Sequence, residues 1–161
     1  MDLNEVDFRA IQYLMTQGRI TWSELAGVLE LSAPATADRV RRLEERGVIS
    51  GYAALVDPDA IGCGLTAFVS VTLEKSKHLN TFLKKVQNLP EIQECHHVTG
   101  EDDYLLKIRC RDTAELERLV GQELKSITGI SKTRTTIVLS TAKESPILPL
   151  NWPSDDAADE E

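Results

Sequence analysis

The chain has 161 residues, of which 42% are hydrophobic and 27% are charged, and its formal net charge is −8 at pH 7. This length suits one ordinary domain or two small ones, and the composition is close to that of globular proteins. No apolar run approaches the roughly 18 residues of a membrane span, and the acidic N-terminus lacks the charge order of a secretory signal. We therefore expect a globular cytoplasmic protein with no membrane partner.

The acidic charge is concentrated at the C-terminal end. Residues 1–50 contain six arginines and eight acidic residues, and residues 51–150 contain twelve basic and thirteen acidic ones. Residues 151–161 add five acidic side chains and no basic one. The net charge therefore leaves nucleic-acid binding open for the rest of the chain, and the acidic tail, residues 146–161, is expected to be disordered.

The N-terminal third of the sequence predicts consecutive helices. Apolar residues recur at helical spacing over residues 3–17, and Gly18 stands where a helix commonly ends. Thr21 is followed three residues later by Glu24. This pattern is typical of a capping box, so a second helix is expected to start here and to end near Glu30.

A third helix completes a helix-turn-helix in residues 1–50. Ser32 can cap this helix, Pro34 is tolerated in its first turn, and the helix is expected to extend to Arg46. The short link before it would fix it across the second helix, as DNA recognition requires. The inward face is expected to hold Thr36, Val40, Leu43 and Gly47. The outward face is expected to hold Pro34, Ala35, Asp38, Arg41 and Arg42, with Arg39 at its flank. These residues, together with Ser32, are the candidate contacts for double-stranded DNA.

The arginines of this helix have two interpretations. Guanidinium groups match phosphate oxygens and the O6/N7 edge of guanine, which favours DNA contact. The alternative is a solvated helix face, in which Arg41 pairs with Glu44 or Glu45 and Arg39 with an acid of the first helix such as Asp7.

The other residues of the outward face offer little base recognition. Asp38 would repel phosphate unless it accepts a hydrogen bond from a cytosine amine, and a plain solvated acid is the alternative. Ala33, Pro34, Ala35 and Ala37 supply few hydrogen-bonding groups. We therefore expect readout of DNA shape to dominate.

A second domain is predicted at residues 65–145, after a linker at residues 51–64 that contains proline and glycine breakers. Its order β-α-β-β-α-β predicts a ferredoxin-like α+β fold, in which two helices cover one face of four antiparallel strands. The other face is expected to be covered by a partner subunit, which makes the protein a homo-oligomer. The predicted strands are residues 66–73, 92–99, 104–110 and 130–141, and the predicted helices are residues 79–89 and 112–124.

No metal site, cofactor or catalytic group is predicted. His96 and His97 are adjacent on a predicted strand, so they point to opposite faces and cannot share a metal. The cysteines Cys63, Cys95 and Cys110 lack zinc-ligand spacing and are interpreted as buried small hydrophobes. The three crowded carboxylates of residues 101–103 could shift each other's pKa values and act as a general acid and base. No nucleophile accompanies them, so a solvated turn or an effector loop is favoured over catalysis.

The sequence resembles the leucine-responsive and asparagine-responsive (Lrp/AsnC, or feast/famine) family of prokaryotic regulators. The resemblance spans about residues 2–150 and rests on Gly18-Arg19, Glu24-Leu25-Ala26, Leu31-Ser32, residues 39–44, Gly47-Val48-Ile49, Glu91-Ile92, Gly100 with residues 103–106, and Gly129-Ile130 with residues 133–135. It implies a winged-helix-like DNA-binding head, a ferredoxin-like effector domain, dimers that assemble into tetramers or octamers, and amino acids bound between dimers.

The resemblance also implies an effector site on the turn after the second strand. Its candidate residues are Thr99, Gly100, Glu101, Asp102, Asp103, Tyr104, Thr133 and Thr135. Asp102 stands where the family usually has an apolar side chain, and a carboxylate near the cleft would favour a cationic effector such as lysine or arginine. The alternative function is a ferredoxin-like small-molecule-binding protein whose helical head docks proteins instead of DNA.

Overall fold

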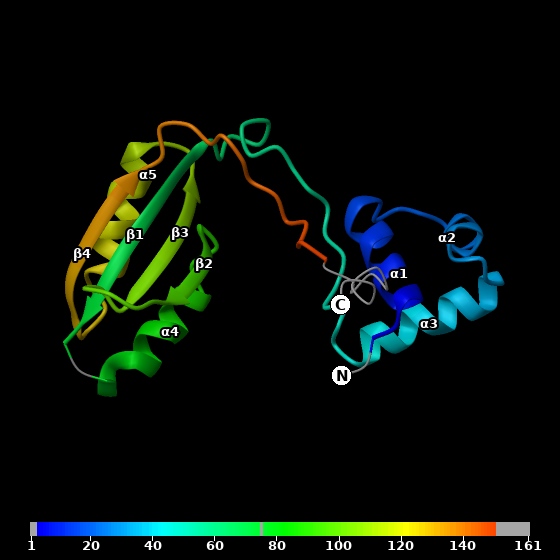
Figure 1. Cartoon of the computed structure of the whole chain (residues 1–161). Helices are drawn as coiled ribbons and strands as arrows, with labels where there is room; N and C mark the ends of the chain where they lie inside the picture. Colours follow the sequence, from blue (N-terminus) through cyan, green and yellow to red (C-terminus); the bar gives the residue numbers. More distant parts are fainter. Residues whose placement is uncertain (1–2, 75, 151–161) are drawn as a thin grey trace, which may run out of the picture. The chain divides into compact units, whose positions relative to one another are not determined.

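A computed structural model describes residues 3–74 and 76–150 (Figure 1). Two compact units are distinguished within it. One holds residues 3–54 and 143–150, and the other is Leu55–Ala142. The larger part of the predicted acidic tail, residues 151–161, lies outside the described residues.

Three helices form the N-terminal unit, and local side-chain caps set where each begins. In the first, Asn4 and Asp7 accept hydrogen bonds from each other's backbone N–H groups. The predicted capping box of Thr21 and Glu24 is confirmed in the second, and the Ser32 hydroxyl caps the third. The helices are α1 (Glu5–Thr16), α2 (Trp22–Leu29) and α3 (Ala33–Glu45).

The helices of this unit pack around a small apolar core. Its fully enclosed side chains are Ala10, Leu25, Leu29 and Val40. As predicted, α3 turns Thr36, Val40 and Leu43 inward. The prediction for Gly47 was wrong, because this residue lies just beyond the helix, exposed, with a left-handed φ of 69° that lets the chain turn away.

The second unit contains one antiparallel sheet in the order β2-β3-β1-β4. This is the predicted ferredoxin-like arrangement, although the second and fourth strands end earlier than expected. The strands are β1 (Leu65–Leu73), β2 (Ile92–His97), β3 (Tyr104–Cys110) and β4 (Ile130–Ile137). The helices are η1 (Ser76–His78), α4 (Leu79–Gln87) and α5 (Thr113–Arg118), which continues into a π-helical segment, η2 (Leu119–Leu124).

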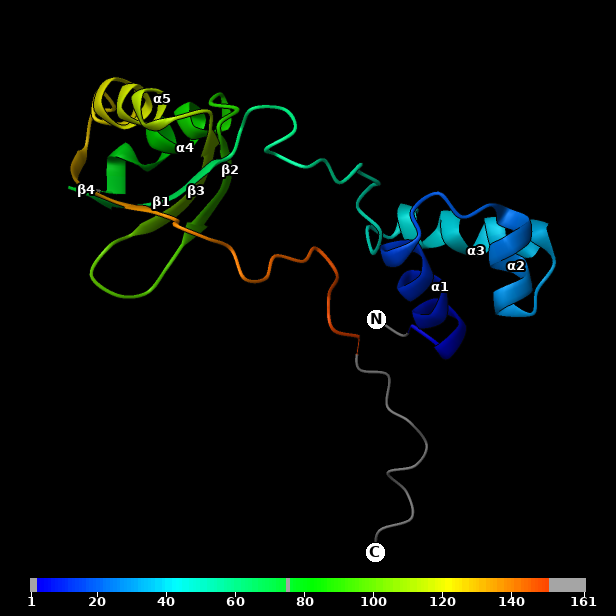
Figure 2. The same ribbon diagram turned by 90° about the horizontal axis from the view of Figure 1, so that it is seen from above.

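Both longer helices lie on the same face of the sheet (Figure 2). Alternate residues of β1 point toward them, and Val69 and Val71 are fully buried against Phe82 of α4 and Leu119 of η2. The intervening side chains of β1 belong to the uncovered face. The cysteine prediction holds for Cys110, which is buried, but Cys63 and Cys95 are only partly buried.

The linker at residues 50–57 is extended and forms no strand, and it leads into a turn at residues 58–62. Among the helices of the described residues, none combines the length and the apolar character that crossing a membrane would require.

Candidate nucleic-acid interface and effector site

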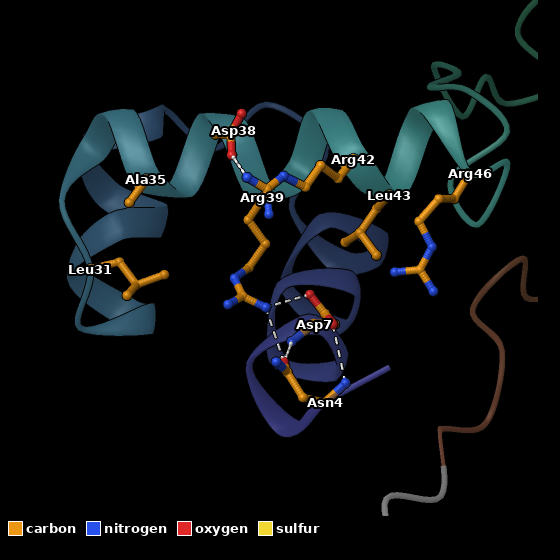
Figure 3. A pocket seen from close by; sticks show the side chains of 9 residues that line it. All are labelled: Asn4, Asp7, Leu31, Ala35, Asp38, Arg39, Arg42, Leu43 and Arg46. Atoms are coloured by element: carbon orange, nitrogen blue, oxygen red, sulfur yellow. Dashed lines mark hydrogen bonds and ion pairs between the residues drawn. The ribbon is translucent and has the colours of Figure 1, made fainter. Parts of the chain in front are cut away.

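Helix α3 presents the charged face predicted for DNA contact (Figure 3). Its N-terminus is held by the Ser32 hydroxyl, which accepts a hydrogen bond from the backbone N–H of Ala35 at 3.3 Å. Pro34 and Ala35 are exposed in the first turn. The small side chains allow the backbone of this end to approach a ligand closely.

Arg39 is not free on this face. Its Nη1 donates to Asp7 Oδ1 at 2.6 Å and to Asn4 Oδ1 at 3.0 Å. The Asp7 side chain is only 9% exposed and that of Arg39 is 30% exposed, so the pair is partly shielded from solvent. The interpretation in which Arg39 is held by an acid of the first helix therefore describes the structure, and Arg39 fixes α3 against the start of α1.

Asp38 stands at the centre of the exposed charges. Its carboxylate pairs with Arg41, and its Oδ2 lies 2.5 Å from Arg42 Nη2. Arg41 also lies 3.3 Å from Glu45, one of the two predicted partners. The hydrogen bond from Arg41 is the main cause that lowers the pKa of Asp38, and the same bond raises the pKa of Arg41. Asp38 and Arg41 are thus both charged near neutral pH.

A hollow of about 440 Å³ lies beside these residues, between α3 and the start of α1 (Figure 3). Arg39, Arg42 and Arg46 line it together with Asn4 and Asp7. Arg46 has no ion-pair partner among residues 3–74 and 76–150. Sequence reasoning missed Arg46 as a contact residue, although its spacing of four residues from Arg42 places it on the same helix face.

The turn between β2 and β3 is tied to the sheet by two carboxylates. Asp102 is 8% exposed, and its oxygens accept hydrogen bonds from Thr72 Oγ1 at 3.0 Å and from Arg134 Nη2 at 2.7 Å. Asp103 Oδ2 accepts from the backbone N–H of Leu73 at 2.7 Å. Two acids of the turn, Asp102 and Asp103, are therefore bonded to the sheet, whereas the third, Glu101, is exposed.

The structure changes the interpretation of Asp102 as an effector contact. The Asp102 carboxylate is paired with Arg134 of the same chain, which weakens the argument that it selects a cationic ligand. The preference for lysine or arginine stays a prediction. Sequence reasoning missed Arg134 and Thr72. Their contacts with Asp102 depend on the strand register, in which Arg134 lies opposite Ser70 of β1.

The remaining candidate effector residues do not form one cluster. Gly100 and Glu101 are exposed at the tip of the turn, and Gly100 has a φ of 127° that favours glycine. Tyr104 is buried in the core against Phe82. Thr133 and Thr135 alternate with Arg134 along β4, and they therefore lie on the opposite face of the sheet from it. Among the described residues, neither threonine forms a hydrogen bond with the turn, so the candidate residues that lie together in one chain are those of the turn itself, residues 99–103, joined by Arg134. 

A capped recognition helix with arginines on its outer face, joined to a separate antiparallel α+β domain, defines a DNA-binding regulator with a ligand-binding domain. Residues 3–50 match the model of the winged helix-turn-helix DNA-binding domain, and residues 66–148 match that of the Lrp/AsnC ligand binding domain. The chain belongs to the Lrp/AsnC family. Its members are transcriptional regulators, not enzymes.

Known relatives extend over nearly the whole chain. The leucine-responsive regulatory protein of Escherichia coli K12 is 40% identical over 146 residues, which cover 89% of each chain. A transcriptional regulator from Neisseria meningitidis, solved as an L-Met complex, has a TM-score of 0.89 at 32% identity over 93% of this chain and 98% of its own. The feast or famine regulatory protein of Mycobacterium tuberculosis, complexed with L-methionine, has a TM-score of 0.84 at 35% identity over 91% and 99%.

Proposed function

We propose that this regulator binds double-stranded DNA through the exposed face of α3 and responds to an amino acid bound at the turn of residues 99–103. The observation that carries the proposal is the helix face itself, where Arg42 and Arg46 line an open hollow and the neighbouring Arg41 is exposed. Guanidinium groups at such a surface suit phosphate oxygens. The proposed DNA contacts are Ser32, Pro34, Ala35, Asp38, Arg41, Arg42 and Arg46, with Arg39 as a positioning residue.

The proposed effector is a neutral amino acid. Two similar regulators were solved with L-methionine, and in this chain the Asp102 carboxylate, which was expected to favour a cationic side chain, is paired with Arg134. Exposed backbone at Gly100 and Glu101 can receive the charged ends of an amino acid. Isothermal titration with methionine, leucine and lysine tests this proposal, and tighter binding of lysine than of methionine would contradict it.

We further propose that the protein works in the cytoplasm as a homo-oligomer of paired subunits. Apolar side chains are exposed in the segments that flank the sheet, and such exposure is a feature of association surfaces. These side chains are Leu55, Val56, Ile61 and Leu139. Sedimentation velocity on the full chain measures the assembly, and a monomer at micromolar concentration would contradict this part of the proposal.

DNA binding is tested through its dependence on salt. A head that neutralises several phosphates loses affinity linearly in a log-log plot against salt concentration. On a duplex that the wild-type protein selects from a random library, Arg42→Ala should reduce that slope by about one, as expected for the loss of one phosphate contact. Arg111→Ala removes an exposed arginine of the other unit and serves as the control. Binding without a salt slope would favour the alternative, a head that docks proteins.

A further inference from the structure

Two exposed arginines of the recognition helix, Arg41 and Arg42, are held by acids of the same helix. Asp38 lies three residues before Arg41 and four before Arg42, so one carboxylate reaches both guanidinium groups. Arg41 has a second acidic partner in Glu45. A phosphate that approaches this face must therefore replace a carboxylate that is already in place.

Asp38 differs from the other acids near this face in what it contacts. Glu45 reaches Arg41 alone, and Glu44 accepts a hydrogen bond from Tyr52 at 2.9 Å. Asp7 is shielded and holds Arg39. Asp38 alone among these acids pairs with two arginines, and its side chain remains 37% exposed. It can therefore meet a base edge as well as an arginine.

The chemistry of the major groove decides when this carboxylate can be released. A carboxylate repels phosphate everywhere on a duplex, but it accepts a hydrogen bond from the exocyclic amine that cytosine presents in the major groove. On DNA without an amine at that position, Asp38 has no partner except its own arginines. On DNA with the amine, the carboxylate turns to the base, and Arg41 and Arg42 become available to the phosphates.

We infer that Asp38 is a specificity-determining residue, which restrains Arg41 and Arg42 on DNA of arbitrary sequence and releases them where a cytosine amine meets its carboxylate. This inference rests on the proposed DNA-binding function. Asp38 would thereby weaken sequence-independent binding, because such binding depends on how many phosphates the arginines neutralise. Specificity of this kind comes from a repulsive element as much as from an attractive one.

The test compares Asp38→Ala with Glu45→Ala in the full chain. Both variants remove one negative charge from the same helix, but only the first frees two arginines. Affinity for a labelled random-sequence duplex is measured over a range of salt concentrations, and circular dichroism verifies that each variant is folded. Asp38→Ala should bind about tenfold more tightly with a slope steeper by one to two, and Glu45→Ala should change each quantity by less than half as much.

Two further measurements separate release of the arginines from a simple change of charge. In the background of Arg42→Ala, the gain caused by Asp38→Ala should shrink by about half, because one of the released groups is absent. Selection from a random duplex library should recover a cytosine preference at one position with wild type that Asp38→Ala lacks.

The outcomes distinguish the inference from the function on which it rests. Equal effects of Asp38→Ala and Glu45→Ala, or an unchanged salt slope, would overturn the role of Asp38 while leaving DNA binding intact. If neither wild type nor any variant binds a duplex, the proposed DNA-binding function fails, and the inference fails with it.

Discussion

Arg134 of β4 donates a hydrogen bond to Asp102 of the β2–β3 turn at 2.7 Å, across a separation of 32 residues in the sequence. The contact joins an edge strand to the loop proposed to bind the effector. Because Asp102 is buried and Arg134 remains 57% exposed at its side chain, the carboxylate is the shielded partner of the pair. The exposed member of this pair is therefore the cation.

This relationship predicts how Asp102→Asn affects ligand binding. The variant should keep the Thr72 hydrogen bond but weaken the hold on Arg134, so the turn loses part of its fixed geometry. We expect methionine affinity to fall severalfold, with no gain for lysine, because the Asp102 carboxylate is paired in wild type and does not select the ligand. Calorimetry on wild type and the variant measures both affinities. This account would be refuted if wild type bound lysine more tightly than methionine and Asp102→Asn bound methionine more tightly than lysine.

A second prediction concerns the contact between the first and third helices. Arg39→Ala should lower the free energy of unfolding of the N-terminal unit by about 1–3 kcal/mol, because it leaves the shielded Asp7 carboxylate without its charged partner. Urea unfolding followed by the fluorescence of Trp22 in α2 measures the loss. Arg42→Ala, whose partner is exposed, is the control and should change stability by less than about 0.5 kcal/mol.

A third prediction uses a buried hydroxyl in α3. The Thr36 side chain is fully enclosed, and its Oγ1 has no hydrogen-bond partner among the described residues. Thr36→Val replaces the hydroxyl with a methyl group of similar size, so stability should rise by about 1 kcal/mol. Thermal unfolding measures the change. A lower melting temperature would mean that the hydroxyl has a partner, such as a water molecule.

A fourth prediction concerns the pH dependence of Tyr52. Partial burial of the ring, together with the hydrogen bond to Glu44, raises the pKa of Tyr52 to about 12. The neutral phenol is thus favoured in the folded state. Its contribution to stability should be complete below the unfolded pKa of about 10 and should be lost as the pH rises through about 12.

The difference in tyrosinate absorbance between wild type and Tyr52→Phe isolates this titration. Glu44→Gln should move the pKa of Tyr52 back toward 10, because it removes the acceptor charge. A midpoint near 10 in wild type would show that the hydrogen bond is not formed in solution.

Local signals in the sequence predicted most of the fold. Caps such as Ser32 and Thr21 act within one helical turn, so their pattern is visible in a few consecutive residues. Strand ends were less well predicted. β4 stops at Ile137, although the β-forming residues continue beyond it, because the pairing with β1 ends at Ala67.

The candidate sites were harder to predict because they depend on partners that are distant in the sequence. The link between Arg39 and Asp7 could be anticipated, since the packing of α1 on α3 brings their charges together. The pairing of Asp102 with Arg134 could not, because it requires the strand order and the face on which each side chain lies. The sequence around Arg134 gave no reason to choose this arginine over the neighbouring threonines, Thr133 and Thr135, as a site residue.

The strand order leaves β2 and β4 at the two edges of the sheet, each with a row of backbone groups that a further strand could pair with. Both edges carry charged or ionisable side chains, with Glu94 and His96 on β2 and Lys132 and Arg134 on β4. Charges on edge strands discourage the sheet from extending itself with strands of other molecules. The fold therefore carries its own protection against fibrous aggregation.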